Sequence, residues 1–202
     1  MSEVIETTKD GRYRVVLEPD ADCESPMNND YCWNVSVFQT YVTNRWGNYE
    51  SVVLYDPEGR IDAMRHFERS SLSDFTMHPD AAFIRYMSIF YGITVHEVTV
   101  GSEGIHGLAW VETSERERVG STDDAENIQV SLEEYNSWAR GECYGYVVEE
   151  LVTWTRDDDS DIETYKDEWE PTDSSLWGLI GYEYAERSAR EALAEEEFSR
   201  LP

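Results

Sequence analysis

Lysine is scarce in this 202-residue chain, because Lys9 and Lys166 are the only lysines among its 16 basic residues. Acidic residues number 43, and the formal net charge at pH 7 is -27. Proteins bind nucleic acid and anionic membranes largely through Lys and Arg, which neutralise phosphate groups. The charge balance therefore argues against direct binding to either partner.

Cysteine is also rare, and its spacing fits neither a disulfide framework nor a zinc site. The three cysteines, Cys23, Cys32 and Cys143, are an odd number with no C-x-x-C pair among them. We expect reduced, partly buried thiols in a reducing cytoplasm.

Long apolar runs are missing. No window approaches the 18 or so apolar residues of a membrane span, and the N-terminus has no basic start followed by an apolar stretch. The apolar fraction is nevertheless 40%, with 13 Tyr and seven Trp, which is enough to build a core. We expect a soluble cytoplasmic protein.

Motifs for catalysis are missing as well. The sequence has no G-x-S-x-G, no H-E-x-x-H and no Gly-rich phosphate loop followed by Lys. The four histidines have no Asp, Ser or Cys at a spacing typical of a catalytic group; they are His66, His78, His96 and His106. We therefore predict no enzyme activity, no catalytic residue, no cofactor and no metal.

Alternating apolar residues predict several strands, the longest of them at 143–155. The others lie at 13–18, 31–43, 49–55, 93–100 and 105–112, and the last two are suited to form a hairpin.

Three helices are predicted from apolar periodicity and Gly stops. The first runs from Pro79 to Gly92 with a buried stripe of Ala82, Tyr86 and Ile89 or Phe90. The second begins before Ser131 and ends at Gly141. The third runs from Tyr182 to about Arg200 and has two favourable i,i+4 ion pairs, Glu183 with Arg187 and Glu186 with Arg190.

These elements predict an α+β fold. We expect a flexible tail at 1–11 and a single domain at 12–202, with a mostly antiparallel sheet of four to five strands and about three helices.

The most acidic segment, residues 156–173, is predicted to be a solvated loop. Its spacing also matches positions 1, 3, 5, 7 and 12 of a calcium loop, at Asp157, Asp159, Asp161, Glu163 and Glu168. Ile162 stands where that loop needs Gly, which disfavours calcium. Paired carboxylates could also serve hydrolysis, but nothing in the sequence marks one of them as the acid.

Two explanations compete for the acidity. Carboxylates keep a protein hydrated in concentrated salt, and an acid-rich, lysine-poor composition resembles the proteins of extreme halophiles. Alternatively, rows of carboxylates imitate phosphates and occupy the basic groove of a nucleic-acid-binding protein. At about 1 M salt the screening length is only ~3 Å, so such a mimic would act through direct contacts.

Four stretches together resemble a family of small accessory proteins of tailed viruses, plasmids and integrated mobile elements without an established activity. They are V-L-E-P-D-A-D-C-E-S-P-M-N-N-D at 16–30, S-E-G-I-H-G-L-A-W-V at 102–111, E-E-Y-N-S-W-A-R-G-E-C-Y-G-Y-V-V-E at 133–149 and D-S-S-L-W-G-L-I-G at 173–181. The chain departs from the family at Val100-Gly101, where relatives carry Trp-Asp, and it lacks their His-Ser-Gly piece. The resemblance implies a mobile-element protein in a host cell cytoplasm.

The resulting hypothesis is a non-enzymatic viral accessory protein that binds and inhibits a host nucleic-acid-binding defence protein, of the anti-restriction or anti-CRISPR type. Most aromatic residues are expected in the core, with Trp169 beside Pro171 as an exposed anchor. The predicted partner-binding residues are Asp157, Asp158, Asp159, Asp161, Glu163, Asp167, Glu168, Trp169 and Glu170. The alternative is a salt-adapted replication or assembly protein whose acidity serves solubility alone.

Overall fold

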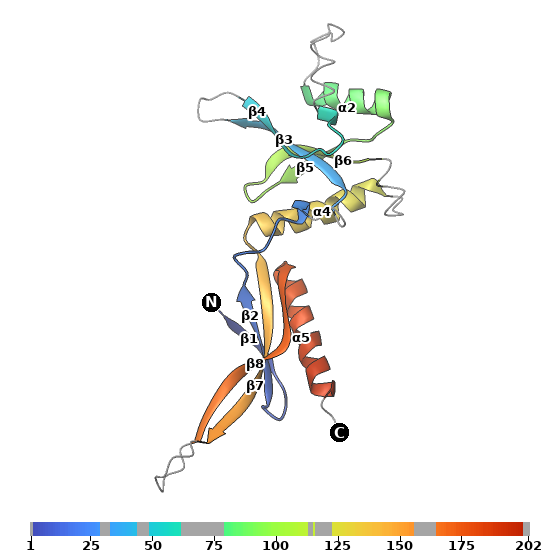
Figure 1. Ribbon diagram of the computed structural model, residues 1–202. Helices are drawn as coiled ribbons and strands as arrows, with labels where there is room; N and C mark the ends of the chain where they lie inside the picture. Colours follow the sequence, from blue (N-terminus) through green and yellow to red (C-terminus); the bar gives the residue numbers. More distant parts are fainter. Residues whose placement is uncertain are drawn as a thin grey trace. The chain divides into compact units, whose positions relative to one another are not determined.

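The computed structural model describes residues 2–28, 33–43, 49–61, 79–112, 115, 123–155 and 165–199. The chain divides into two compact units, each with its own sheet (Figure 1). Met1–Glu24 and Gly141–Pro202 form the unit that we call the terminal unit. Ser25–Arg140 form the other, which we call the inserted unit.

The elements of the terminal unit are β1 (Glu3–Thr7), β2 (Tyr13–Pro19), β7 (Cys143–Thr155), β8 (Tyr165–Ile180) and α5 (Tyr182–Ser199). The strands form an antiparallel sheet in the order β1-β2-β7-β8. The predicted long strand at 143–155 is confirmed as β7, which lies at the centre of this sheet. It joins the strand from the N-terminal end of the chain to the strand near its C-terminal end.

Helix α5 covers one face of the terminal sheet, which we call its helix face. Its buried residues Ala185, Ala189 and Leu193 recur every four positions, as the 3.6-residue period requires. They pack on apolar side chains of the strands, which include Tyr13, Val15, Leu17, Val148 and Leu179. The predicted helix is confirmed, and so is the pair between Glu186 and Arg190, at 2.9 Å.

The N-terminal segment corrects the expectation of a flexible tail at 1–11, because Glu3–Thr7 form β1 and pair with β2. Ile5 packs against both apolar clusters that α5 covers, and Glu6 forms an ion pair with Arg190 of that helix. A five-residue strand with only two apolar residues gains its stability from its neighbours, so the local pattern did not reveal it.

The elements of the inserted unit are η1 (Pro26–Asn28), β3 (Val35–Thr43), β4 (Tyr49–Tyr55), α2 (Pro79–Tyr91), β5 (His96–Val100), β6 (Ile105–Val111) and α4 (Asp124–Ala139). Its strands form a second antiparallel sheet in the order β4-β3-β6-β5. Helices α2 and α4 lie on opposite faces of it (Figure 1). The predicted hairpin of β5 and β6 is confirmed.

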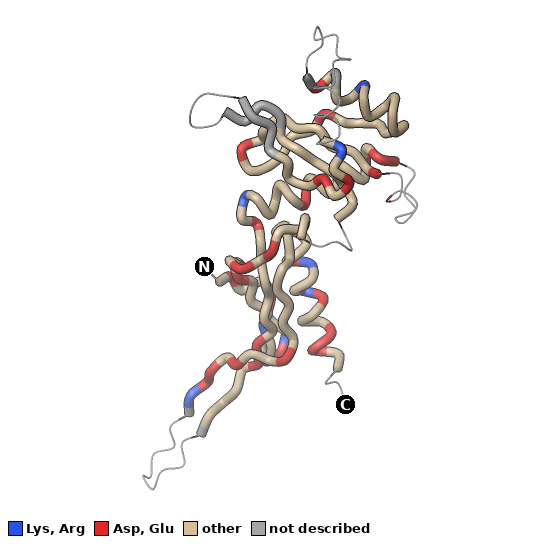
Figure 2. The backbone as a smooth tube through the Cα atoms, turned by 45° about the horizontal axis from the view of Figure 1, so that its top comes forward, with Lys and Arg blue, Asp and Glu red and all other residues tan. Residues whose placement is uncertain are grey.

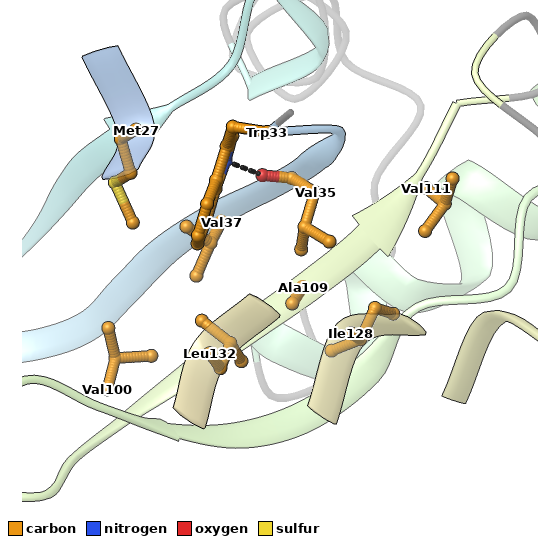
Figure 3. Packing of buried hydrophobic residues seen from close by; sticks show 9 residues of the cluster. All are labelled: Met27, Trp33, Val35, Val37, Val100, Ala109, Val111, Ile128 and Leu132. Carbon is orange, nitrogen blue, oxygen red and sulfur yellow. Dashed lines mark hydrogen bonds between the residues drawn. The ribbon is translucent and has the colours of Figure 1, made fainter. Parts of the chain in front are cut away.

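The α4 side of this sheet is an apolar cluster, drawn in Figure 3, made of Met27, Trp33, Val35, Val37, Val100, Ala109, Val111, Ile128 and Leu132. Trp33 donates a hydrogen bond from Nε1 to the Val35 carbonyl oxygen at 2.6 Å, which satisfies its buried polar atom. Helix α4 starts at the N-cap Asp123, upstream of Ser131 as expected, and Gly141 after it has φ 77°. That left-handed value suits Gly.

The α2 side holds a second cluster, in which Phe38, Phe83, Leu108 and Trp110 are buried. The predicted helix is confirmed, but its buried stripe is corrected. Phe83 and Met87 are fully buried and the predicted Tyr86 is buried as well, whereas Ile89 and Phe90 are exposed. Both faces of α2 carry apolar residues, so periodicity alone did not identify the inner one.

The α+β class, the antiparallel strands and the three helices are confirmed. The eight described strands form two sheets of four, which corrects the expectation of one sheet of four to five strands. Strand patterns show where a strand lies but not which strand it pairs with. The pairing of β2 with β7, across the whole inserted unit, is the step that the sequence does not reveal.

Candidate interaction surface on the β7–β8 ribbon

Strands β7 and β8 extend beyond the rest of the terminal sheet. β2 pairs with β7 only from Tyr144 to Glu150, and the last backbone bond runs from Leu151 N to the Arg12 carbonyl oxygen at 2.8 Å. Past this point Leu151–Thr155 pair with Tyr165–Trp169 alone. This two-stranded part, which we call the outer ribbon, projects from the sheet in Figure 1.

The strand register divides the outer ribbon and its base into two faces. Cross-strand partners share a face, and neighbours along a strand alternate. Val152 lies opposite Glu168 and Glu150 opposite Glu170, on the same side as the helix face. Thr153 lies opposite Asp167 and Leu151 opposite Trp169, on the other side.

The predicted contact residues 167–170 therefore do not form one surface. Asp167 and Trp169 lie on one face of the ribbon, and Glu168 and Glu170 lie on the other. The predicted acidic loop is also corrected in part, because residues 165–173 belong to the strand β8. Each residue from Tyr165 to Pro171 lies opposite a residue of β7, which holds this acidic stretch in a strand.

The remaining predicted contact residues lie outside the described residues. They are Asp157, Asp158, Asp159, Asp161 and Glu163. By connectivity they belong to the segment 156–164, which joins the ends of β7 and β8. Four of the five residues of the alternative calcium loop fall there too; the fifth, Glu168, is in a strand and pairs with Lys166.

Trp154 is the exposed aromatic residue of the ribbon, with 52% of its surface accessible. Its indole Nε1 donates a hydrogen bond to Glu170 Oε1 at 3.0 Å, which ties the ring to a carboxylate of the same face. This exposure corrects the expectation that the aromatic residues other than Trp169 lie in the core. Trp154 is exposed because it lies four residues beyond the last residue of β7 that pairs with β2, Glu150.

Trp169, the predicted exposed anchor, is half-buried. The Arg14 guanidinium lies over its ring, 4.4 Å from the centroid, in a cation–π contact. Arg14 Nε also donates to Glu149 Oε2 at 2.6 Å. Trp169 therefore packs at the base of the ribbon and is not an exposed anchor. Trp154 is the exposed aromatic residue instead.

Local partners organise the carboxylates. Arg12 donates to Glu150 Oε1 at 2.7 Å, which neutralises the base of the ribbon. Further out, Thr153 Oγ1 donates to Asp167 Oδ1 at 2.6 Å, and Lys166 pairs with Glu168. Exposed pairs of this kind contribute little stability, roughly 0–1 kcal/mol each. Their effect is to fix where the negative charges stand.

Other polar clusters in the described residues look structural. Glu112 is 3% exposed; it accepts from Arg60 Nη2 at 3.0 Å and from Trp110 Nε1 at 2.9 Å. His106 Nε2 lies 3.5 Å from Asp80 Oδ2 at the surface. Within the described ranges no three metal-ligating side chains gather, and no helix there is long and apolar enough to cross a membrane.

Comparisons of the chain with protein-family models, with curated proteins and with solved structures found no match.

Proposed function

We propose that this chain is a non-enzymatic binding protein whose contact surface is the outer ribbon. The observation that carries the proposal is the combination of an exposed Trp154 and fixed carboxylates on a ribbon that has both faces accessible. A sheet core needs neither feature, and an isolated two-stranded ribbon is only marginally stable by itself.

The chemistry of the ribbon indicates a basic partner. Buried aromatic side chains are frequent anchors of protein interfaces, and charge complementarity sets which partner associates and how fast. The helix-side surface offers Trp154, bonded to Glu170, together with Glu168 and its partner Lys166, and the opposite surface offers Asp167. A nucleic-acid-binding protein presents the matching surface, because its groove is lined with Lys and Arg.

The identity of the partner rests on the resemblance to accessory proteins of mobile elements. Such an element benefits from blocking the nucleic-acid-binding components with which its host attacks foreign DNA. We therefore propose a component of a restriction or CRISPR system as the partner, with the ribbon and the acidic segment 156–164 occupying its channel.

A second function is favoured by the distribution of charge. Asp and Glu occur along the described parts of both units, including α5, and not only on the ribbon (Figure 2). Most of the net charge is then explained by hydration in concentrated salt. On this alternative the protein serves viral replication or assembly, and the ribbon carboxylates make no contact.

The test is a pull-down from host lysate at the salt of the native cytoplasm, with bound proteins identified by mass. The variant D167N/E168Q/E170Q removes three ribbon charges but keeps the acceptors for Thr153 and Trp154. The matched control, E191Q/E195Q/E197Q, removes three exposed charges from α5. The proposal expects a nucleic-acid-binding protein that DNA displaces, lost with the ribbon variant and kept with the control.

Equal loss with both variants would mean that binding follows net charge and not the ribbon. No loss with either variant, or capture of replication or virion proteins alone, would favour the salt-adapted alternative. The substitution Trp154→Ala adds a readout that salt does not screen, and its proposed effect is a weakening of at least about tenfold.

A further inference from the structure

Two cysteines that are far apart in the sequence lie together in the terminal unit. The pairing of β2 with β7 continues past the end of β2, where Asp20 N donates to the Cys143 carbonyl oxygen at 2.9 Å. A turn follows, closed by a bond from Asp22 N to Asp20 Oδ1 at 3.0 Å. This turn leads the chain back towards Cys143, and the Cys23 side chain is near enough to contribute to the raised pKa of the Cys143 thiol.

The two thiols differ in access. Cys143 is 4% exposed at the start of a central strand, whereas Cys23 is half-buried in the segment after the turn. Neither is in a disulfide. An oxidant from solution therefore meets Cys23 first, and Cys143 stands behind it as the only described thiol within reach.

We propose that Cys23 and Cys143 form an oxidisable pair, in which a hydroperoxide oxidises Cys23 and Cys143 then closes a disulfide. In the first step the Cys23 sulfur takes the terminal hydroxyl of the peroxide and becomes a sulfenic acid, while the peroxide leaves as water or alcohol. In the second step the Cys143 sulfur attacks the sulfenic sulfur, its proton leaves with the hydroxyl, and water is released. The peroxide is reduced, and the two thiols lose one hydrogen atom each.

This pair has a particular place in the chain. Cys23 immediately precedes the last residue of the first terminal segment, Glu24, and Cys143 follows soon after Gly141, where the chain returns. The disulfide would close a covalent ring that contains the whole of Ser25–Arg140. Cross-links that close long loops restrict the unfolded chain most, so oxidation should raise the unfolding temperature.

The surroundings of Cys143 set the speed of the second step. Burial raises the pKa of the Cys143 thiol to about 12, and the neighbouring Cys23, Asp20 and Glu142 act in the same direction. The thiolate is the attacking form, so ring closure is slow at neutral pH and accelerates as pH rises towards 12. The same property makes Cys143 a poor leaving group, so the disulfide resists reduction once formed.

The experiment uses the full chain and its C32S variant, reduced, freed of reductant and treated with hydrogen peroxide. Acid quenching, alkylation of the remaining thiols in denaturant and peptide mapping by mass follow. We expect a Cys23–Cys143 cross-linked peptide lighter by two hydrogen atoms, loss of alkylation at both residues, and faster migration of the unreduced monomer on a denaturing gel. The variant C143S should accumulate a sulfenic acid at Cys23 that dimedone traps.

Three results would overturn the inference. Both thiols could remain alkylatable after excess peroxide, Cys23 could proceed to sulfinic acid without a cross-link, or the main products could be disulfides to Cys32 or between two chains. The matched variants C23S and C143S separate a folding defect from lost chemistry, because thermal unfolding of each reduced protein is measured alongside. The inference does not depend on the proposed function.

Discussion

The two sheets differ in how many of their faces a helix covers. In the inserted unit α2 and α4 cover both faces, and Val37, Leu108 and Trp110 are fully buried between them. In the terminal unit α5 is the one described helix, and it covers one face. Side chains on the other face of that sheet, which we call its open face, have only their neighbours for cover.

Trp177 illustrates the open face. Its ring lies directly on Gly145, where a Cβ atom would come within 2.2 Å of ring atom Cε3, yet 47% of the residue remains exposed. A row of valines, Val4, Val16 and Val147, crosses the same face by strand register. The inserted sheet is thus specialised for stability, and the terminal sheet leaves surface accessible.

The largest contrast is expected from truncating one side chain in each sheet. Trp110→Ala removes a ring enclosed between the sheet and α2 and should lower the free energy of unfolding by about 3–5 kcal/mol. Val16→Ala on the open face should cost about 1–2 kcal/mol, because it removes two methyl groups next to partly open surface. Urea unfolding measures both, and hydrogen exchange at β6 and β2 amides reads each sheet separately. Equal costs would contradict the comparison.

A paired glycine experiment sharpens the contrast. At Gly107 in β6 a Cβ atom would lie 2.7 Å from the Phe38 carbonyl oxygen, which is backbone held in the sheet. Gly107→Ala should therefore cost about 2–3 kcal/mol. At Gly145 the obstacle is the Trp177 ring, which can swing outward over the open face, so Gly145→Ala should cost about 1 kcal/mol.

The readout that separates these two variants is tryptophan emission. Gly145→Ala should shift it to longer wavelength, because the displaced Trp177 ring becomes more hydrated, while Gly107→Ala leaves it unchanged in the folded state. An unchanged spectrum in Gly145→Ala would show that the strand moves instead of the ring.

One side chain in each unit, Tyr86 or Cys143, has a raised pKa that should make stability depend on alkaline pH. Burial raises the pKa of Tyr86 in the inserted unit to about 12, with the Tyr91 hydroxyl contributing, and it raises that of Cys143 in the terminal unit likewise. The unfolded chain loses these protons at lower pH, near the ordinary pKa values of 10.0 for Tyr and 9.0 for Cys, while the folded chain keeps them. The contribution of these two groups to the free energy of unfolding is therefore fully present below about pH 9 and is lost as pH rises towards 12.

Substitution assigns this loss to the two units. Tyr86→Phe should flatten the decline above pH 10 for the inserted sheet, and Cys143→Ala should flatten the decline that begins near pH 9 for the terminal sheet. The measurement is urea unfolding across pH 8 to 11 under reducing conditions. A decline that neither substitution reduces would contradict the assignment.

The most local effect is expected where α4 meets the β5–β6 hairpin. Asn136 Oδ1 accepts from Gly101 N at 2.7 Å, and its Nδ2 donates to the Thr99 carbonyl oxygen at 3.1 Å. Asn136→Ala should cost about 1–2 kcal/mol because both bonds are lost at a partly exposed site. The hydrogen exchange of the hairpin amides should increase, and that of the terminal sheet should stay as it is.

The sequence predicts local structure well where the signal is local. Gly stops and apolar periodicity place α2 and α5 within a residue or so and the end of α4 within two residues, and alternation identifies β7. It fails where partners are distant: β1 needs β2, and Trp154 is exposed because β2 begins at Tyr13, opposite Glu150, and does not extend alongside Trp154. The carboxylates of the ribbon were identified from the sequence. Their division over two faces was not, because it depends on which strands pair.

The placement of the inserted unit between β2 and β7 has a consequence for synthesis on the ribosome. When Arg140 has been added, every strand of the inserted sheet exists, so that unit can fold while translation continues. The β1–β2 hairpin has been made much earlier, but its partner β7 has not, and a lone hairpin is barely stable. The apolar residues of this hairpin therefore remain exposed until β7, β8 and α5 have been synthesised. The β1–β2 hairpin, although synthesised before the inserted unit, is therefore protected after it, and chaperones should bind the nascent chain there.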